Sequence, residues 1–191
     1  YKIVGSSLSG IELGGNDLST TSLSGIIIAN NVMVNMPSGG LSMGFNNHPA
    51  ENLDTLIIAN NIIHNCYTNG GGTAVNLHHI GDNSLSGSFG SEAEIIFDYN
   101  IISQGENGCS AMGYNGNFLD NYDDFVNDYN LNLHGANVNP SLNSEFKPDD
   151  INDPTVDAGL DFSGFFDTDI EGNVRPNGTA WDIGAYEYTS G

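Results

Sequence analysis

The amino-acid sequence predicts an all-β solenoid of about four to six stacked coils, and three observations predict it. Short strings rich in Ile, Val and Leu return along the chain at a spacing of about thirty to forty residues. These strings show no helical period. Asn, Gly and Ser, which disfavour helices, are abundant. Because one coil of this length cannot bury its apolar side alone, the coils are expected to stack and to share one core.

The first repeated string is a short strand that ends in a polar corner. Four copies align: "GIELGGND" from Gly10, "GLSMGFNN" from Gly40, "GTAVNLHH" from Gly72 and "SAMGYNG" from Ser110. The alignment gives four columns: Leu13, Met43, Val75 and Met112; Gly14, Gly44, Asn76 and Gly113; Gly15, Phe45, Leu77 and Tyr114; and Asn16, Asn46, His78 and Asn115. Stacking turns the polar corner into one continuous stripe along the solenoid.

The second repeated string is an apolar strand pair around a central Asn. Its copies are "IIIANNVMVN" (26–35), "LIIANNIIHN" (56–65), "IIFDYNIIS" (95–103) and "VNDYNLNL" (126–133). One column contains Asn31, Asn61, Asn100 and Asn130. An Asn side chain at a tight bend can bond to the backbone of the next coil and tolerates the left-handed conformation. The column therefore predicts a structural Asn ladder.

These residues also carry a family resemblance. The "IIANNII" string with "GG" loops resembles right-handed single-stranded parallel β-helix proteins of the pectin-lyase-like superfamily. The tail, "NPSLNSEF", "DPTVDAGLDF", "DTDIEGNVRP" and "DIGAYEY", is similar to the terminal segment of many secreted bacterial and archaeal proteins of that fold. The resemblance implies coils over 1–138 and a C-terminal capping segment of the same domain over 139–191. One relative within this resemblance is disaggregatase, an archaeal enzyme that breaks the polysaccharide matrix between cells. The composition, with few basic residues and many Asn and Ile residues, fits such a source.

The tail is expected to cover the open end of the solenoid, because an uncovered β-edge would recruit another chain. The apolar lid is predicted to consist of Trp181, Ile183, Tyr186 and Tyr188. We expect Arg175 to play a structural part and to pair with Asp169, Glu171 or Glu187. At the other end, "YKIVGSSLSGIEL" opens directly into a coil. This opening predicts that further N-terminal coils of the same parent protein precede Tyr1 and act as its partner.

The charge of the chain restricts its partners. Three Lys and Arg residues stand against 24 Asp and Glu residues, which gives a formal net charge of -21. Nucleic acids and anionic membrane surfaces would be repelled, so neither is an expected partner. The sequence contains no apolar run of about 18 residues, so membrane insertion is not expected. The resemblance implies a secreted or cell-surface protein with a polysaccharide as its partner.

The polar stripe is the predicted substrate-binding surface, with ordinary solvated turns as the alternative. The resemblance implies a long polysaccharide that lies along the parallel sheet. The expected substrate is an acidic or amino-sugar-containing extracellular polysaccharide. The predicted substrate-binding residues are Asn16, Asn46, Asn47, His48, Asn76 and Asn115.

Two reactions are compatible with this surface. A glycoside hydrolase needs two carboxyl groups about 5–10 Å apart, and the candidates are Glu12, Asp17, Asp82 and Glu106. A polysaccharide lyase needs a base and a cation that neutralises the substrate carboxylate. Since Lys2, Lys147 and Arg175 lie outside the stripe, the base would be His78 or His79, with Ca²⁺ as the cation. Hydrolysis is favoured over elimination, and a non-catalytic carbohydrate-binding adhesin is the rival.

An acidic loop, "LDNYDDFVNDYN" (119–130), predicts a Ca²⁺ site. Its candidate ligands are Asp120, Asp123, Asp124 and Asp128. Carboxylate oxygens are the ligands that Ca²⁺ prefers, but a solvated acidic loop is an equal alternative. Zinc is disfavoured, because the consecutive His78 and His79 point to opposite faces of a strand. His64 and His134 are interpreted as structural, and the two cysteines, Cys66 and Cys109, as small buried residues rather than a disulfide.

Overall fold

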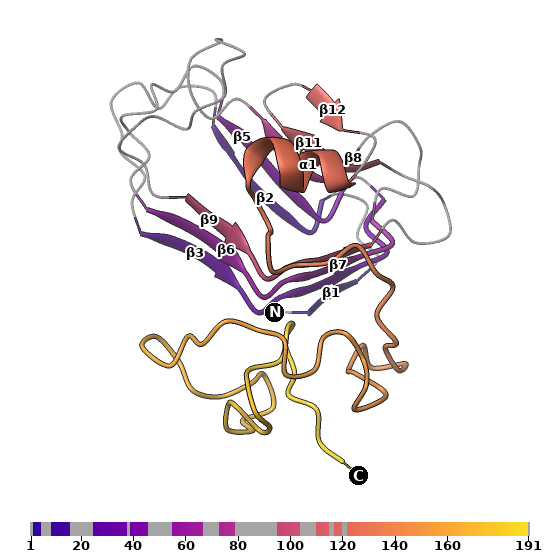
Figure 1. The fold of residues 1–191 in the computed structure, drawn as a ribbon, viewed down its shortest axis with the longest axis vertical. Coiled ribbons are helices and arrows are strands. Elements are labelled where there is room, and N and C mark those ends of the chain that lie inside the picture. Colours follow the sequence, from indigo (N-terminus) through magenta and orange to yellow (C-terminus); the bar gives the residue numbers. More distant parts are fainter. Residues whose placement is uncertain are drawn as a thin grey trace.

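The part of the chain that the structure describes is all-β apart from one short helix. The computed structural model describes residues 2–4, 9–15, 25–37, 39–45, 55–66, 73–78, 95–103, 110–114, 117–119 and 122–190. Figure 1 shows that the strands form three sheets around a common interior, with an irregular tail on one side.

The three sheets, I, II and III, have four, five and three strands. Sheet I has the order β1 (Lys2–Val4), β4 (Val32–Val34), β7 (Ile62–His64) and β10 (Ile101–Ser103). Sheet II has the order β12 (Asn117–Leu119), β11 (Ser110–Tyr114), β8 (Thr73–His78), β5 (Leu41–Phe45) and β2 (Ile11–Gly15). Sheet III has the order β3 (Ile26–Ala29), β6 (Leu56–Ala59) and β9 (Ile95–Asp98).

The chain passes through the sheets in a repeating order, II, III, I, and one such passage is called a coil below. Neighbouring coils pair through parallel strands in all three sheets. The arrangement is consistent with a parallel β-helix, as the repeated strings predicted. The only antiparallel pair among the named strands joins β12 to β11 at the last coil.

The register confirms most of the predicted alignment and corrects one part of it. Ile26, Leu56 and Ile95 lie opposite one another, as do Leu13 and Met43. Between β5 and β8, however, Met43 lies opposite Leu77 rather than Val75. Because side chains alternate with a period of two, a shift of two residues leaves every residue on its own side of the sheet.

The Asn ladder forms the corner between sheets III and I. The Nδ2 group of Asn31 donates to Oδ1 of Asn61 at 2.8 Å, and Nδ2 of Asn61 donates to Oδ1 of Asn100 at 2.9 Å. The fourth member is Asn132, whose Oδ1 accepts from the backbone N–H of Asn100 at 2.8 Å. The prediction of Asn130 was therefore wrong. Asn130 directly follows the helix Tyr122–Tyr129, is exposed and has φ of 52°.

In the first three coils the left-handed conformation belongs to the residue before the ladder Asn, whereas Asn132 adopts it itself, with φ of 57°. Asn30, Asn60 and Tyr99 have φ of 54°, 56° and 57°. The sequence interpretation placed the bend and the hydrogen bonds in one Asn, whereas in the first three coils two consecutive residues share these tasks. A pair such as Asn30–Asn31 thus turns the chain and then connects it to the next coil.

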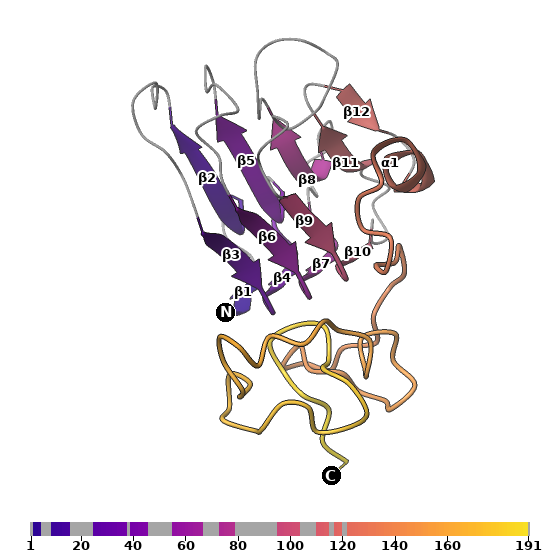
Figure 2. The same ribbon diagram turned by 60° about the vertical axis from the view of Figure 1, so that its left-hand side comes forward.

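The core lies between the sheets and is closed at the last coil. It includes Met33, Leu41, Leu56, Ile63 and Ile102, all fully buried. The helix α1 (Tyr122–Tyr129) packs Tyr122 and Val126 against this cluster. Together with β12, α1 occupies the end of the coil stack (Figure 2).

The tail packs along the side of the coils instead of across their end. Ile183, Ala185 and Tyr186 contact the outer residues of sheet I, among them Ile62. Phe162 and Trp181 contact Ala59 of sheet III. Figure 2 shows the tail below the coils, while α1 lies at their end. The expectation that the tail covers the end was therefore wrong, and the boundary between 1–138 and 139–191 stays a prediction.

The interior of the tail is organised by one buried ion pair. The guanidinium of Arg175 donates to the Glu187 carboxylate at 2.7 Å, and both side chains are 1% exposed. It also donates to the carbonyl oxygens of Asp182 and Gly184 at 3.0 and 2.9 Å. This confirms the structural interpretation of Arg175 and selects Glu187 among its predicted partners.

Of the two cysteines, Cys66 is buried, and its thiol lies 3.4 Å from the carbonyl oxygen of Met33. Cys109 lies outside the described residues. Within the described ranges, no helix has the length and the apolar character that crossing a membrane requires.

Candidate functional site

Polar residues lie opposite one another, in a row, on neighbouring strands of sheet II. In β2, Ile11 and Leu13 pack against the core, and Glu12 between them is exposed. Glu12 lies opposite Ser42 of β5, which lies opposite Asn76 of β8. Parallel strands are about 4.8 Å apart, so successive members of the row follow at that distance. Figure 1 places sheet II on the side of the molecule away from the tail.

A second row on the same sheet contains glycines and a histidine. Gly14 lies opposite Gly44, and Gly44 lies opposite His78. The sequence alignment predicted that His78 lies at the corner beside Asn46, and this prediction was wrong. Because of the two-residue shift between β5 and β8, His78 lies within a strand. Glycines leave the backbone of a sheet accessible to the close approach of a flat ligand.

The structure brings only part of the predicted site together. Glu12, Asn76 and His78 share sheet II, with β5 between the strand of Glu12 and the strand of the other two. Two strand spacings separate β2 from β8, about 10 Å. The remaining predicted catalytic and substrate-binding residues lie outside the described residues: Asp17, His79, Asp82, Glu106, Asn16, Asn46, Asn47, His48 and Asn115.

The acidic segment is a helix and not a loop. Asp123, Asp124 and Asp128 belong to α1, and Asp120 lies outside the described residues. Tyr122 and Val126 are four residues apart and both pack on the core, which explains why the segment is helical. Asp124 and Asp128 also share one face of the helix by spacing. Among the described residues, no three His, Cys, Asp or Glu side chains group around a possible metal position, and the Ca²⁺ site stays a prediction.

A cluster around Asp98 was missed by the sequence interpretation. Its Oδ1 accepts the backbone N–H groups of Tyr99 and His134 at 2.8 and 2.7 Å. Its Oδ2 lies 2.7 Å from Nδ1 of His134, and the rings of Tyr99 and His134 stack at 4.8 Å. The signal was present in the sequence, since Asp98–Tyr99 replaces the Ala–Asn pair of the two earlier coils. The cluster fastens the segment after α1 to the last described coil.

His64 is held in sheet I. It lies opposite Ser103, and its Nδ1 is 2.5 Å from the Ser103 hydroxyl. Burial lowers the pKa of His64 below its usual value, which favours the neutral ring in this hydrogen bond. Both His64 and His134 are thus engaged in the fold, in agreement with their structural interpretation.

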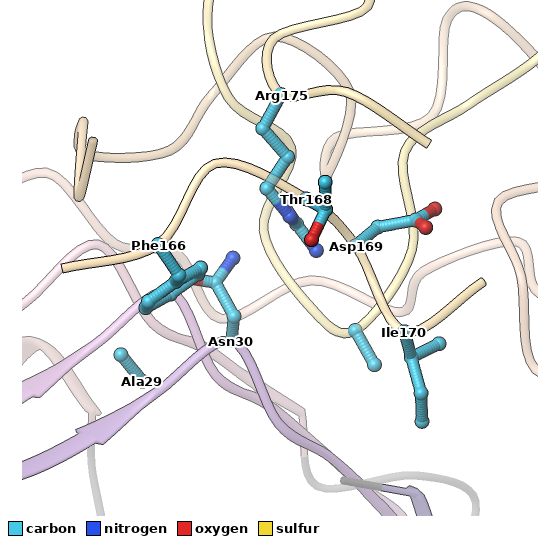
Figure 3. A pocket seen from close by; sticks show the side chains of 8 residues that line it. Ala29, Asn30, Phe166, Thr168, Asp169, Ile170 and Arg175 are labelled. Atoms are coloured by element: carbon cyan, nitrogen blue, oxygen red, sulfur yellow. The ribbon is translucent and has the colours of Figure 1, made fainter. Parts of the chain in front are cut away.

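A cavity of about 290 Å³ lies between the first coil and the tail (Figure 3). Its walls come from one coil corner and from three separate parts of the tail. It is lined by Ala29, Asn30, Phe166, Thr168, Asp169, Ile170, Arg175 and Ala185. No local sequence pattern marks this cavity, because its residues meet only when the tail has docked.

Comparison of the chain with models of protein families, with curated proteins and with solved structures gives no match.

Proposed function

We propose that this chain is part of a secreted or cell-surface polysaccharide-degrading enzyme built as a right-handed single-stranded parallel β-helix. The glycan lies along the outer face of sheet II, across the coils. The observation that carries the proposal is the register-matched row of Glu12, Ser42 and Asn76 beside the glycines of the next row. Such a row offers hydrogen-bonding groups at a regular spacing, and the glycines leave room for sugar rings.

Hydrolysis is the reaction that this face favours. Glu12 is an exposed carboxyl group at the surface of the face and would protonate the leaving glycosidic oxygen as general acid. The second carboxyl group would come from Asp17 or Asp82. A second carboxylate must lie about 5–10 Å from the first, and neighbouring coils provide distances of that order.

The basic residues argue against a lyase that uses Lys or Arg as its base. Lys147 binds the carboxylates of Glu145 and Glu171 at 3.1 and 2.6 Å, and Arg175 is buried with Glu187. Both pairs belong to the tail, away from sheet II. The chain has one further basic residue besides its histidines, Lys2, which lies in β1 of sheet I.

A histidine-dependent lyase is the second candidate, because β8 carries His78 on the same sheet as Glu12. His78 would abstract the proton next to a uronate carboxylate, and Ca²⁺ would neutralise that carboxylate. A non-catalytic glycan-binding protein uses the same face without turnover.

The test combines a substrate panel with a matched pair of variants. Acidic and neutral polysaccharides are incubated with the protein, with and without Ca²⁺, and new reducing ends and the ultraviolet absorbance of unsaturated sugars are followed together. Reducing ends without that absorbance indicate a hydrolase, and both signals indicate a lyase.

Glu12→Gln should lower turnover about 100-fold or more, since it removes the acid. Glu145→Gln removes the same charge at an exposed position of the tail and should leave turnover unchanged. Full turnover in Glu12→Gln would move the acid to another residue. Retention on a glycan without any product would leave a binding protein as the conclusion.

A further inference from the structure

The cavity between the first coil and the tail has the features of a small binding site on a different surface from sheet II. Its volume of about 290 Å³ is at the lower end of the range for small-molecule sites, about 300–1,000 Å³. Phe166, Ile170, Ala29 and Ala185 give it an apolar wall. Thr168, Asn30 and Arg175 supply the polar part (Figure 3).

The aromatic wall is held in place from behind. Phe166 stacks on Phe162 at a centroid distance of 5.9 Å with an interplanar angle of 8°. The ring of Trp181 meets Phe166 at 5.2 Å in an edge-on arrangement. Trp181 is itself 2% exposed, so the cluster has little freedom to rearrange. A fixed aromatic ring binds ligands at a low cost in conformational entropy.

Arg175 leaves one donor of this site unused. Its Nη groups donate to Glu187, Asp182 and Gly184, but Nε is buried without a hydrogen-bond partner. A buried unpaired N–H group is unfavourable unless an acceptor reaches it. An oxygen atom of a ligand in the cavity would provide that acceptor.

The charges around the cavity disfavour an anionic ligand. Arg175 is neutralised by Glu187, and the carboxylates of Asp169 and Asp182 lie beside it. The Asp169 carboxylate accepts from the backbone N–H groups of Glu171, Asn173 and Glu187, so it is not available as a ligand group. A suitable ligand is therefore neutral, carries oxygen acceptors and has an apolar face.

We propose that this cavity binds a neutral monosaccharide unit, with its apolar face against Phe166 and its hydroxyl groups toward Thr168 and Arg175. The inference goes beyond the proposed function, since it concerns a second surface and requires no turnover. It gives the tail a binding role in addition to its packing role.

Trp181 provides a built-in reporter, because it is the single Trp of the chain and touches both Phe166 and Arg175. Glucose, galactose and N-acetylglucosamine are titrated into the intact chain, and Trp emission is recorded. We expect a saturable change with a dissociation constant of about 1–10 mM for at least one of them, the range for ligands of this size. Glucuronate should bind about tenfold more weakly because of the surrounding carboxylates.

Three variants test the position of the site. Phe166→Ala should weaken binding about tenfold. Its neighbour Phe165 is 66% exposed and does not line the cavity, so Phe165→Ala should bind as the unchanged chain does. Thr168→Val changes an exposed side chain without disturbing the aromatic cluster and should weaken binding about threefold or more.

The outcomes separate this proposal from the proposed function. Glu12→Gln must keep the emission change, because Glu12 lies in sheet II and not in the cavity. An unchanged emission with every sugar up to about ten times the upper expected constant would overturn the proposal. Equal binding in Phe165→Ala, Phe166→Ala and Thr168→Val would overturn it too. A response to hexanol alone would assign the cavity to an aliphatic ligand instead.

Discussion

At the scale of single residues, the Asn ladder shows how one side chain joins three coils. Asn61 accepts two hydrogen bonds from Asn31 through Oδ1, at 3.1 and 2.8 Å. Its Nδ2 donates to Asn100 and to the carbonyl oxygen of Ile28. Since Asn61 is fully buried, its partners have no access to water when the amide is removed.

Asn61→Ala should therefore lower the free energy of unfolding by about 2–4 kcal/mol, because several buried groups lose their partner. Urea unfolding followed by circular dichroism measures the change. Asn137→Ala removes the same amide from an exposed position and should stay within about 0.5 kcal/mol of the unchanged chain. Equal stability of the two variants would mean that the ladder is not a source of stability.

Asp182 gives the tail a pH dependence of its own. Burial raises the pKa of Asp182 to about 6, although its carboxylate accepts the backbone N–H groups of Asp157 and Tyr188. The folded pKa lies above the unfolded value of 3.8, so the folded chain favours the protonated carboxyl group. The resulting contribution is fully present below pH 3.8 and is lost as the pH rises through about 6.

The difference in melting temperature between the unchanged chain and Asp182→Asn should therefore move with pH. Relative to the variant, the unchanged chain should lose stability between about pH 4 and pH 7. The comparison cancels the contribution of His64, which both proteins share. A constant difference over this range would show that Asp182 has no raised pKa in the folded chain.

At the scale of elements, the strands were predictable and the parts that cover them were not. The strings around Asn31 and Asn61 repeat in both residue type and spacing, so their register could be predicted from the sequence. Helix α1 was predicted as a loop, because its Asp and Asn residues are poor helix formers. Packing of Tyr122 and Val126 on the core overrides that preference.

The candidate site was only partly predictable for a related reason. Glu12 and Asn76 were identified from the polar pattern, and the structure places both on sheet II. His78 was assigned to the wrong row, since sequence alignment cannot detect a two-residue shift that keeps the inside and outside pattern. The cavity at Phe166 and Arg175 depends on the docking of the tail, which has no periodic signal.

Docking of the tail requires a close approach at Gly184. This residue has φ of 103°, and an added Cβ atom would lie 2.6 Å from Cδ1 of Ile62. Gly184→Ala should therefore destabilise the tail by about 2–4 kcal/mol, from both the clash and the backbone strain. The expected result is faster proteolysis of the tail and a red shift of Trp181 emission.

Gly164→Ala is the matched control for this change. An added Cβ atom at Gly164 meets nothing within 4 Å. We expect unchanged proteolysis and emission in this variant. If both variants behave alike, the tail is not held by close packing at Gly184.

At the scale of the whole molecule, the net charge of -21 works against the compact state. Sodium chloride screens this repulsion over a distance of about 10 Å at 0.1 M. The melting temperature should therefore rise by a few degrees between low salt and about 0.5 M NaCl, because screening stabilises the folded chain more than the expanded one. The buried Arg175–Glu187 pair is shielded from salt and should not reverse this trend.

Calcium is tested in the same experiment. CaCl₂ is compared with NaCl at equal ionic strength, so that screening alone gives equal shifts. A larger shift with Ca²⁺ that disappears in Asp124→Asn would support the predicted site on α1. Equal shifts in melting temperature would mean that Ca²⁺ acts by screening alone and is not a cofactor.

The Asn ladder has a further consequence for how this chain can change. Successive ladder partners are 30, 39 and 32 residues apart, yet the strands on both sides of the corner keep their register. The corner thus tolerates unequal insertions elsewhere in each coil. Foreign segments inserted between β8 and β9 should leave the ladder intact, so the coils are a scaffold on which new loops can be displayed and selected.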